Sequence, residues 1–171
     1  MKISIITVTY NSAATLRDTM ESVLAQTYTD IEYVVVDGLS KDNTMDIVRE
    51  YEPRFQGRMK YISEKDHGLY EAMNKGIRMA TGEIVGIINS DDFYHRNDII
   101  QLVADAMAAS EVQAVYGDVR FVNPENLDKT VRYYSSKIFR PSLFRFGFMP
   151  AHPTFFTYRK YFEQYGYYRS V

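Results

Sequence analysis

The chain of 171 residues contains no cysteine, which excludes disulfides and thiolate metal sites. Its three histidines, His67, His95 and His152, do not have the spacing of a zinc site. No secretory signal is recognisable, because residues 1–10 read as a strand and no small-residue cleavage site follows. The longest clean apolar run, 84–88, is far too short to cross a bilayer. We therefore expect a cytoplasmic protein.

Charge is distributed unevenly along the chain, although the formal net charge is only −2. Residues 1–128 hold 12 Lys and Arg against 21 Asp and Glu, whereas residues 129–171 hold 8 Lys and Arg against one Glu. The second part also carries 14 of the 25 aromatic residues. We expect these two parts of a single domain to meet different partners.

Strand and helix patterns alternate as far as residue 122. Apolar, β-branched stretches predict strands at 2–9, 31–36, 59–62, 83–88 and 113–122. Helices are predicted between them, beginning near Ser12, near Ser40 or Asp42, at Leu69 and near Asn97. The third is predicted to bury Leu69, Met73, Ile77 and Ala80. This alternation predicts an α/β fold, a Rossmann-like, mostly parallel sheet with helices on both faces.

Polar residues gather where the predicted strands end. They are Thr9-Tyr10-Asn11, Asp37-Gly38, residues 64–68 and residues 89–92. Ligands of such sheets bind outside the carboxyl ends of the strands, so we expect one site at this edge.

Asp91 and Asp92 are the candidate metal ligands. Neighbouring carboxylates face apart within a strand, so they can share a site only if the chain turns, which Asn89-Ser90 favours. Hard oxygen donors suit Mg²⁺ or Mn²⁺. The alternative is a solvated turn that leads into the next helix.

The other strand ends offer donor-binding candidates. Asp37 can hold a nucleoside, or can simply be a turn aspartate, and Thr9, Tyr10 and Asn11 can flank a base or cap a helix. Lys75, two helical turns after Gly68, can reach a phosphate or be solvated. His152 stands in a proline-rich loop, where a structural role is more typical than catalysis. No Walker-type loop and no GxGxxG pattern is present, which argues against NTPase, kinase and dehydrogenase functions.

Together these motifs resemble family 2 of the inverting glycosyltransferases, which have the GT-A fold, and in particular its bacterial surface-polysaccharide subgroup. The resembling stretches are TVTYNSAATLRDTMESVLAQTYTDIEYVVVDGLSKDNT (7–44), SEKDHGLYEAMNKGIRMATGEIVGIINSDD (63–92), YGDVRFV (116–122) and FMPAHPTFF (148–156). Their order and spacing fit over most of the chain.

The resemblance implies transfer of a sugar, with inversion, from a nucleotide-sugar donor to a glycan or lipid-linked acceptor. Residues 1–128 would form the donor region and 129–171 the start of the acceptor side. Thr9, Tyr10, Asn11 and Asp37 would surround the nucleoside. Asp66, Asn74 and Lys75 would line the donor pocket. Asp91 would touch the ribose or the metal, and Asp92 would coordinate the Mg²⁺ or Mn²⁺ that bridges the diphosphate.

The sequence departs from the family pattern at two places. The DDGS-like turn is Asp37-Gly38-Leu39-Ser40, so its second carboxylate is missing, which leaves uridine as the favoured nucleoside with guanosine and thymidine as alternatives. The family's catalytic base, an aspartate, is expected beyond Val171, so we expect a C-terminally truncated chain.

The basic, aromatic residues 129–171 indicate contact with an anionic membrane surface, at the inner face of the membrane, or an ordinary acceptor-side core. Nucleic acid is disfavoured as a partner because residues 1–128 are acidic. Two other functions stay open: a non-catalytic sugar-nucleotide-binding fragment, and a sugar nucleotidyltransferase. The second usually has a glycine-rich basic loop after the first strand, which is absent here.

Overall fold

A six-stranded sheet forms the centre of the computed structural model, which describes residues 1–109, 112–147 and 149–169. The strand order is β3-β2-β1-β4-β8-β5. The strands are β1 (Ile3–Thr9), β2 (Ile31–Asp37), β3 (Met59–Ser63), β4 (Ile84–Ile87), β5 (Ala114–Val115) and β8 (Phe156–Tyr158). The first four are mutually parallel, whereas β8 runs antiparallel to β4 and β5. The predicted mostly parallel α/β sheet is therefore confirmed.

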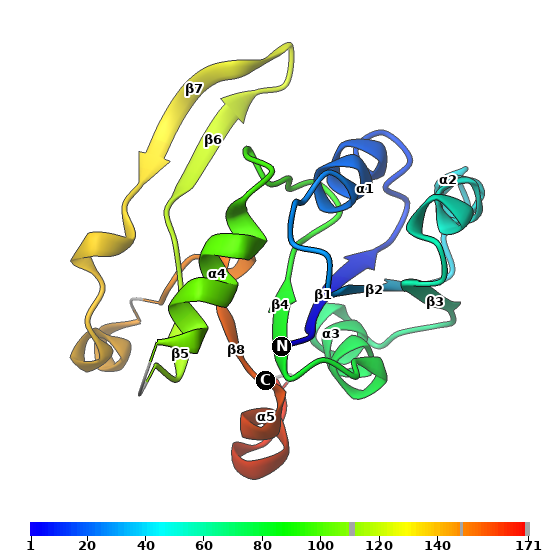
Figure 1. Ribbon diagram of the computed structural model, residues 1–171. Coiled ribbons are helices and arrows are strands. Elements are labelled where there is room, and N and C mark those ends of the chain that lie inside the picture. The colour runs from blue at the N-terminus through cyan, green and yellow to red at the C-terminus, as the bar shows by residue number, and fades with distance from the viewer. Residues whose placement is uncertain (110–111, 148, 170–171) are drawn as a thin grey trace.

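Helices cover both faces of this sheet (Figure 1). Side chains alternate along β1, so Ile3 and Ile5 join one core cluster and Ile6 and Val8 join the other. The first cluster packs under α1 (Leu16–Leu24), α2 (Thr44–Tyr51) and α4 (Ile99–Ala108), and the second under α3 (Leu69–Met79). A 3₁₀ turn, η1 (Glu52–Phe55), follows α2, and the last helix is α5 (Arg159–Tyr165).

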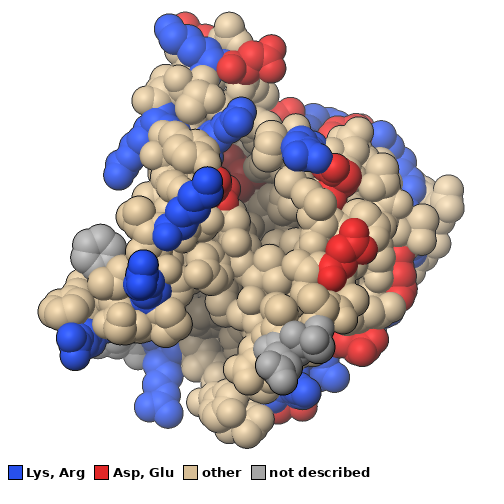
Figure 2. Space-filling view, turned by 60° about the vertical axis from the view of Figure 1, so that its left-hand side comes forward, with Lys and Arg blue, Asp and Glu red and all other residues tan. Residues whose placement is uncertain are grey.

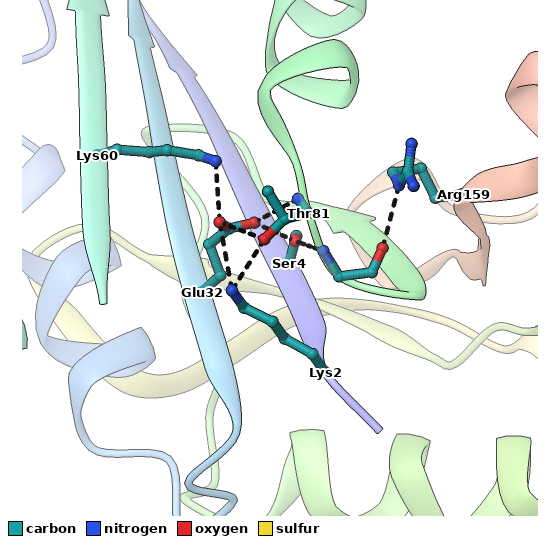
Figure 3. Close-up of polar contacts among 7 residues, drawn as sticks. Lys2, Ser4, Glu32, Lys60, Thr81 and Arg159 are labelled. Carbon is teal, nitrogen blue, oxygen red and sulfur yellow. Dashed lines mark hydrogen bonds and ion pairs between the residues drawn. The ribbon is translucent and has the colours of Figure 1, made fainter. Parts of the chain in front are cut away.

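The amino-terminal end of the sheet is held by a buried carboxylate (Figure 3). Glu32 of β2 is 6% exposed and accepts hydrogen bonds from the Ser4 hydroxyl, from the backbone and hydroxyl of Thr81, and from Lys60. Burial raises the pKa of Glu32, but these hydrogen bonds outweigh it and hold the pKa at about 2. Glu32 thus joins β1, β2 and β3 to the turn that precedes β4, at the end opposite the predicted site.

Two local predictions were wrong. Leu69 is the first residue of α3 and is 56% exposed, whereas Met73, Ile77 and Ala80 are buried as predicted. Residues 113–122 form two strands in different sheets, because Tyr116, Gly117 and Asp118 interrupt them.

The chain after residue 118 builds a separate hairpin that projects away from the main sheet (Figure 1). It pairs β6 (Val119–Asn123) with β7 (Asn126–Tyr134). Three 3₁₀ turns follow, η2 (Ser136–Ile138), η3 (Pro141–Phe146) and η4 (His152–Thr154), before the chain returns to the main sheet as β8. The expected boundary at residue 128 therefore falls inside β7. In the described part of the chain, no helix has both the length and the apolarity to cross a membrane.

Candidate functional site

The carboxyl ends of β1 to β4 meet at one edge, as predicted, and their loops are tied together. Several hydrogen bonds link them, among them Gly38 N to Thr9 O (2.9 Å), Glu64 N to Asp37 O (2.9 Å), Asn11 N to Ser40 Oγ (2.8 Å), and Ser12 Oγ with Ser90 Oγ (2.8 Å). The loops therefore present their side chains from one connected platform.

Asp91 and Asp92 lie in the turn after β4. The backbone N–H of Asp92 donates to Asn89 O (3.1 Å), and the Asn89 amide donates to Asp92 Oδ2 (2.8 Å). Burial raises the pKa of Asp92, and the neighbouring charge of Asp91 raises it further. The hydrogen bonds from Asn89 lower the pKa but do not cancel this rise. Asp91 is more exposed than Asp92. A desolvated carboxylate beside a second one is stabilised in its ionised form by a bound cation.

A pocket of about 400 Å³ opens at this aspartate pair. Its lining residues come from the β4 turn, from the β6–β7 hairpin and from the loop before β8: Asn89, Asp91, Asp92, Val119, Phe121, Tyr134, Ala151, His152 and Pro153. The space-filling view shows a hollow between the hairpin side and the body of the molecule (Figure 2). The hairpin is thus the outer wall of a cavity whose inner wall carries the aspartates.

His152 was expected to be structural, yet it lines the same pocket as the aspartates. Its Nε2 atom is buried and has no hydrogen-bond partner among the described residues. Burial lowers the pKa of His152, so the ring is neutral at neutral pH and can bind a ligand or a cation through nitrogen. Its place in a stretch that resembles the family, 148–156, was the signal in the sequence.

Asp37 lies at the site but is already engaged by its own chain. It is fully buried, and its carboxylate accepts hydrogen bonds from the Ser40 backbone (3.1 Å), the Ser40 hydroxyl and the Ser63 hydroxyl (2.5 Å). These contacts position the loops after β2 and β3, and the contact of Asp37 with a nucleoside stays a prediction.

Thr9, Tyr10 and Asn11 follow β1 as predicted. The Thr9 hydroxyl is buried and has no hydrogen-bond partner in the described part of the chain, and the Tyr10 ring is 58% exposed. Asn11 has a left-handed backbone, φ 51°, and its side chain accepts a hydrogen bond from Lys41 N (2.8 Å). Tyr10 is therefore free to stack on a ligand, while Asn11 shapes the loop.

Lys75 is paired with carboxylates rather than free for a phosphate. Its ammonium lies 2.6 Å from Asp66 Oδ1 and 2.8 Å from Glu64 Oε1. The hydrogen bonds to Asp66 and then Glu64 raise the pKa of Lys75, so it stays charged. Lys75 thus holds Asp66 in place after β3.

Asn74 contacts the end of the chain. Its amide donates to Tyr168 O (2.8 Å) and accepts from Tyr168 N (3.0 Å), and the side chain is buried. The Tyr168 ring packs against Tyr70 and His152. Asn74 therefore fixes the segment that follows α5, and both polar groups of its side chain are used.

The sequence is similar to those of known glycosyltransferases. The family model described as "Glycosyl transferase family 2" matches residues 4–166. An uncharacterized glycosyltransferase of Nostoc sp. is 34% identical over 137 residues, which are 80% of this chain and 42% of the relative. A PGL/p-HBAD biosynthesis glycosyltransferase of Mycobacterium bovis is 38% identical over 117 residues, which are 68% of this chain and 46% of the relative. The chain thus spans less than half the length of these relatives.

Two solved structures share the fold. A mannosyltransferase from Pyrobaculum calidifontis, in complex with GDP-Man and Mn²⁺, superposes with a TM-score of 0.76 at 24% identity, over 98% of this chain and 47% of that one. S. aureus TarS in complex with UDP-GlcNAc has a TM-score of 0.75 at 22% identity, over 96% of this chain and 47% of that one. With the family model covering nearly the whole sequence, the chain belongs to Glycosyl transferase family 2.

Proposed function

We propose that this chain binds the nucleoside diphosphate of a sugar donor at the strand-end platform, as the donor half of a glycosyltransferase. The observation that carries the proposal is the desolvated Asp92 carboxylate beside Asp91, both in the lining of a pocket of about 400 Å³. A pocket of this size fits a small ligand, and its convergent polar groups give orientation.

A divalent cation, Mg²⁺ or Mn²⁺, fits the donor atoms that this pocket presents. Asp91 and Asp92 would hold it through oxygen, and the unpartnered Nε2 of His152 lies in the same lining. Within the described ranges no three His, Asp or Glu side chains are already grouped as a metal site. Two carboxylates suit a cation whose coordination is completed by substrate phosphates. When bound, such an ion neutralises the charge that develops on a leaving diphosphate.

The donor in this proposal is uridine-linked, and the nucleoside lies beside Tyr10. The exposed Tyr10 ring offers a stacking surface at the end of β1. Similar folds hold both UDP-GlcNAc and GDP-Man, so the base has to be read by this chain's own residues.

The acceptor in this proposal is a glycan or a lipid-linked sugar of surface polysaccharide synthesis, and it enters between the aspartates and the β6–β7 hairpin. Exposed apolar and aromatic residues run along this side: Phe121, Leu127, Val131, Tyr133, Ile138, Phe144 and Phe146. Lys and Arg side chains lie on the same side of the molecule, facing the hollow (Figure 2). Basic groups among exposed rings favour peripheral contact with an anionic membrane, where such an acceptor would be presented at the inner face.

A thermal-shift screen tests the proposal. The chain is heated with UDP, GDP or no nucleotide, each with Mn²⁺ or with EDTA. We expect stabilisation by a diphosphate only when the metal is present. If no nucleotide stabilises the folded chain under any condition, donor binding is refuted and a scaffold role is favoured.

A further inference from the structure

Asn74 makes two hydrogen bonds with the backbone of one residue that lies 94 positions further along the chain. Its side-chain amide donates to Tyr168 O (2.8 Å) and accepts from Tyr168 N (3.0 Å). The Asn74 side chain is 9% exposed, and a buried amide is tolerated in a fold while its polar groups have partners. Tyr168 is therefore held at a fixed place beside α3, the helix that carries Asn74.

The Tyr168 ring packs between two helices and the loop before β8. It stacks on Tyr70 of α3, with 5.7 Å between the ring centroids and 16° between the planes. It also contacts Phe162 of α5 at 5.6 Å, and His152 of η4 at 5.7 Å with the planes inclined by 61°. Because three elements contact this ring, it has little freedom to turn.

His152 is the residue through which this packing reaches the candidate site. It lines the same pocket as Asp91 and Asp92. Its Nε2 atom is buried and forms no hydrogen bond with a described residue, so this nitrogen does not fix the orientation of the imidazole. The ring is held by packing instead, and the inclined contact with Tyr168 sets its tilt.

We propose that Asn74 and Tyr168 are positioning residues for the diphosphate and its metal ion, and that they act through His152. The proposal rests on the proposed function, and it deepens it by naming residues that organise the pocket from outside. The described residues that line the pocket include His152 but neither Asn74 nor Tyr168. The imidazole would meet the ion or the phosphates, and Tyr168 would hold it in place before the ligand binds.

A purely structural role of Asn74 and Tyr168 predicts a different behaviour. If their contacts only stabilise the fold, losing them lowers the Tm and leaves the affinity of the folded chain for its ligand unchanged. If their contacts position His152, the affinity falls, and it falls only while His152 is present.

The test is a double-mutant cycle on the whole chain. Calorimetry gives the dissociation constant of UDP in Mn²⁺, or of GDP if only GDP stabilises the chain. Tyr168→Leu removes the ring but keeps the backbone that Asn74 binds, and His152→Ala removes the group through which the ring would act. Tyr168→Phe is the conservative variant that should restore binding, because it retains the ring.

Two more variants sharpen the comparison. Tyr165→Leu is the matched control: it makes the same substitution on α5, at a ring that is 74% exposed and packs on Tyr161. Asn74→Asp breaks the link at its other end, because a carboxylate cannot donate to Tyr168 O. Circular dichroism establishes that each variant is folded at the temperature of the titration.

We expect Tyr168→Leu to weaken nucleotide binding about 10- to 100-fold, the usual effect of losing an outer-shell partner of a metal ligand. Asn74→Asp should weaken it in the same direction, whereas Tyr168→Phe and Tyr165→Leu should stay within about twofold of the wild type. In the His152→Ala background, Tyr168→Leu should change the affinity by no more than about twofold.

An unchanged affinity in folded Tyr168→Leu would overturn the positioning role while donor binding stands. Losses that add in the double variant would overturn it too, because Tyr168 would then act independently of His152. An unchanged affinity in His152→Ala would have the same consequence, since there would be no contact to position. If the folded wild type binds neither UDP nor GDP, the proposed function itself fails.

Discussion

Replacing Asp92 by Asn should separate donor binding from folding. The Asn89 amide can donate to the oxygen of Asn as it does to Asp92 Oδ2, and the backbone contacts of residue 92 to Asn89 and Thr19 do not involve its side chain. Burial raises the pKa of Asp92 in the folded chain above its unfolded value of about 3.9. The protonated carboxyl therefore adds to the free energy of unfolding below the unfolded pKa. That contribution is lost as the pH rises through the folded pKa. At neutral pH the ligand-free variant should be at least as stable as the wild type.

The ligand response should behave in the opposite way. A ligand at about 100 times its Kd stabilises a protein by about 2.7 kcal/mol. For a chain of this size each kcal/mol shifts the Tm by about 2–4 °C, so UDP with Mn²⁺ should raise the wild-type Tm by about 5–11 °C. Asp92→Asn removes one of the two carboxylates that would hold the ion, and most of this shift should disappear.

Differential scanning calorimetry with UDP, in Mn²⁺ or EDTA, measures both effects. Asp46→Asn is the control, because Asp46 lies on α2, is 74% exposed and forms its ion pair with the exposed Arg49. It removes the same charge and should keep the full metal-dependent shift. A full shift in Asp92→Asn would refute the assignment of the metal, and a Tm several degrees lower without ligand would refute the account of its burial.

Three further predictions concern the core, the buried carboxylate and the basic surface. Gly76→Ala should lower the Tm, because the new Cβ atom would lie 2.3 Å from Cγ2 of Ile6. This clash should outweigh the helix propensity of alanine, which exceeds that of glycine by about 1 kcal/mol, and an unchanged Tm would contradict this packing. The wild type should lose stability as the pH falls from about 4.3 to about 2, because Glu32 becomes protonated in this range, and Glu32→Gln should remove that loss. Urea unfolding as a function of pH measures this, and equal pH profiles would contradict the hydrogen bonds assigned to the Glu32 carboxylate. Replacing Arg140 and Arg145 by Ala should weaken binding to anionic liposomes by about thirtyfold, at about 1 kcal/mol for each basic group, and unchanged sedimentation with liposomes would favour an ordinary acceptor-side core.

The parallel part of the fold was predictable because its signals are local. Strands such as Ile3–Thr9 and Ile31–Asp37 are apolar and β-branched, and they alternate with helices of regular apolar spacing. The predictions that were wrong concern residues whose burial or pairing depends on contacts with distant parts of the chain. Leu69 has the spacing of a buried helix residue, but as the first residue of α3 it stays exposed. The stretch 113–122 is uniformly strand-like, yet β5 joins the main sheet through β8 while β6 leaves it to pair with β7.

By itself the sequence determined that the chain is α/β, that polar residues follow four successive strands, and that two adjacent aspartates follow the fourth. These features depend on residue order and on the rule that parallel strands end at one edge. Only the tertiary structure decided which carboxylates are occupied by hydrogen bonds within the fold. Asp37 is saturated by Ser40 and Ser63, whereas Asp66 keeps an unpartnered oxygen beside Gly38. Hydrogen bonding and burial depend on which strand ends become neighbours, and no local pattern contains that information.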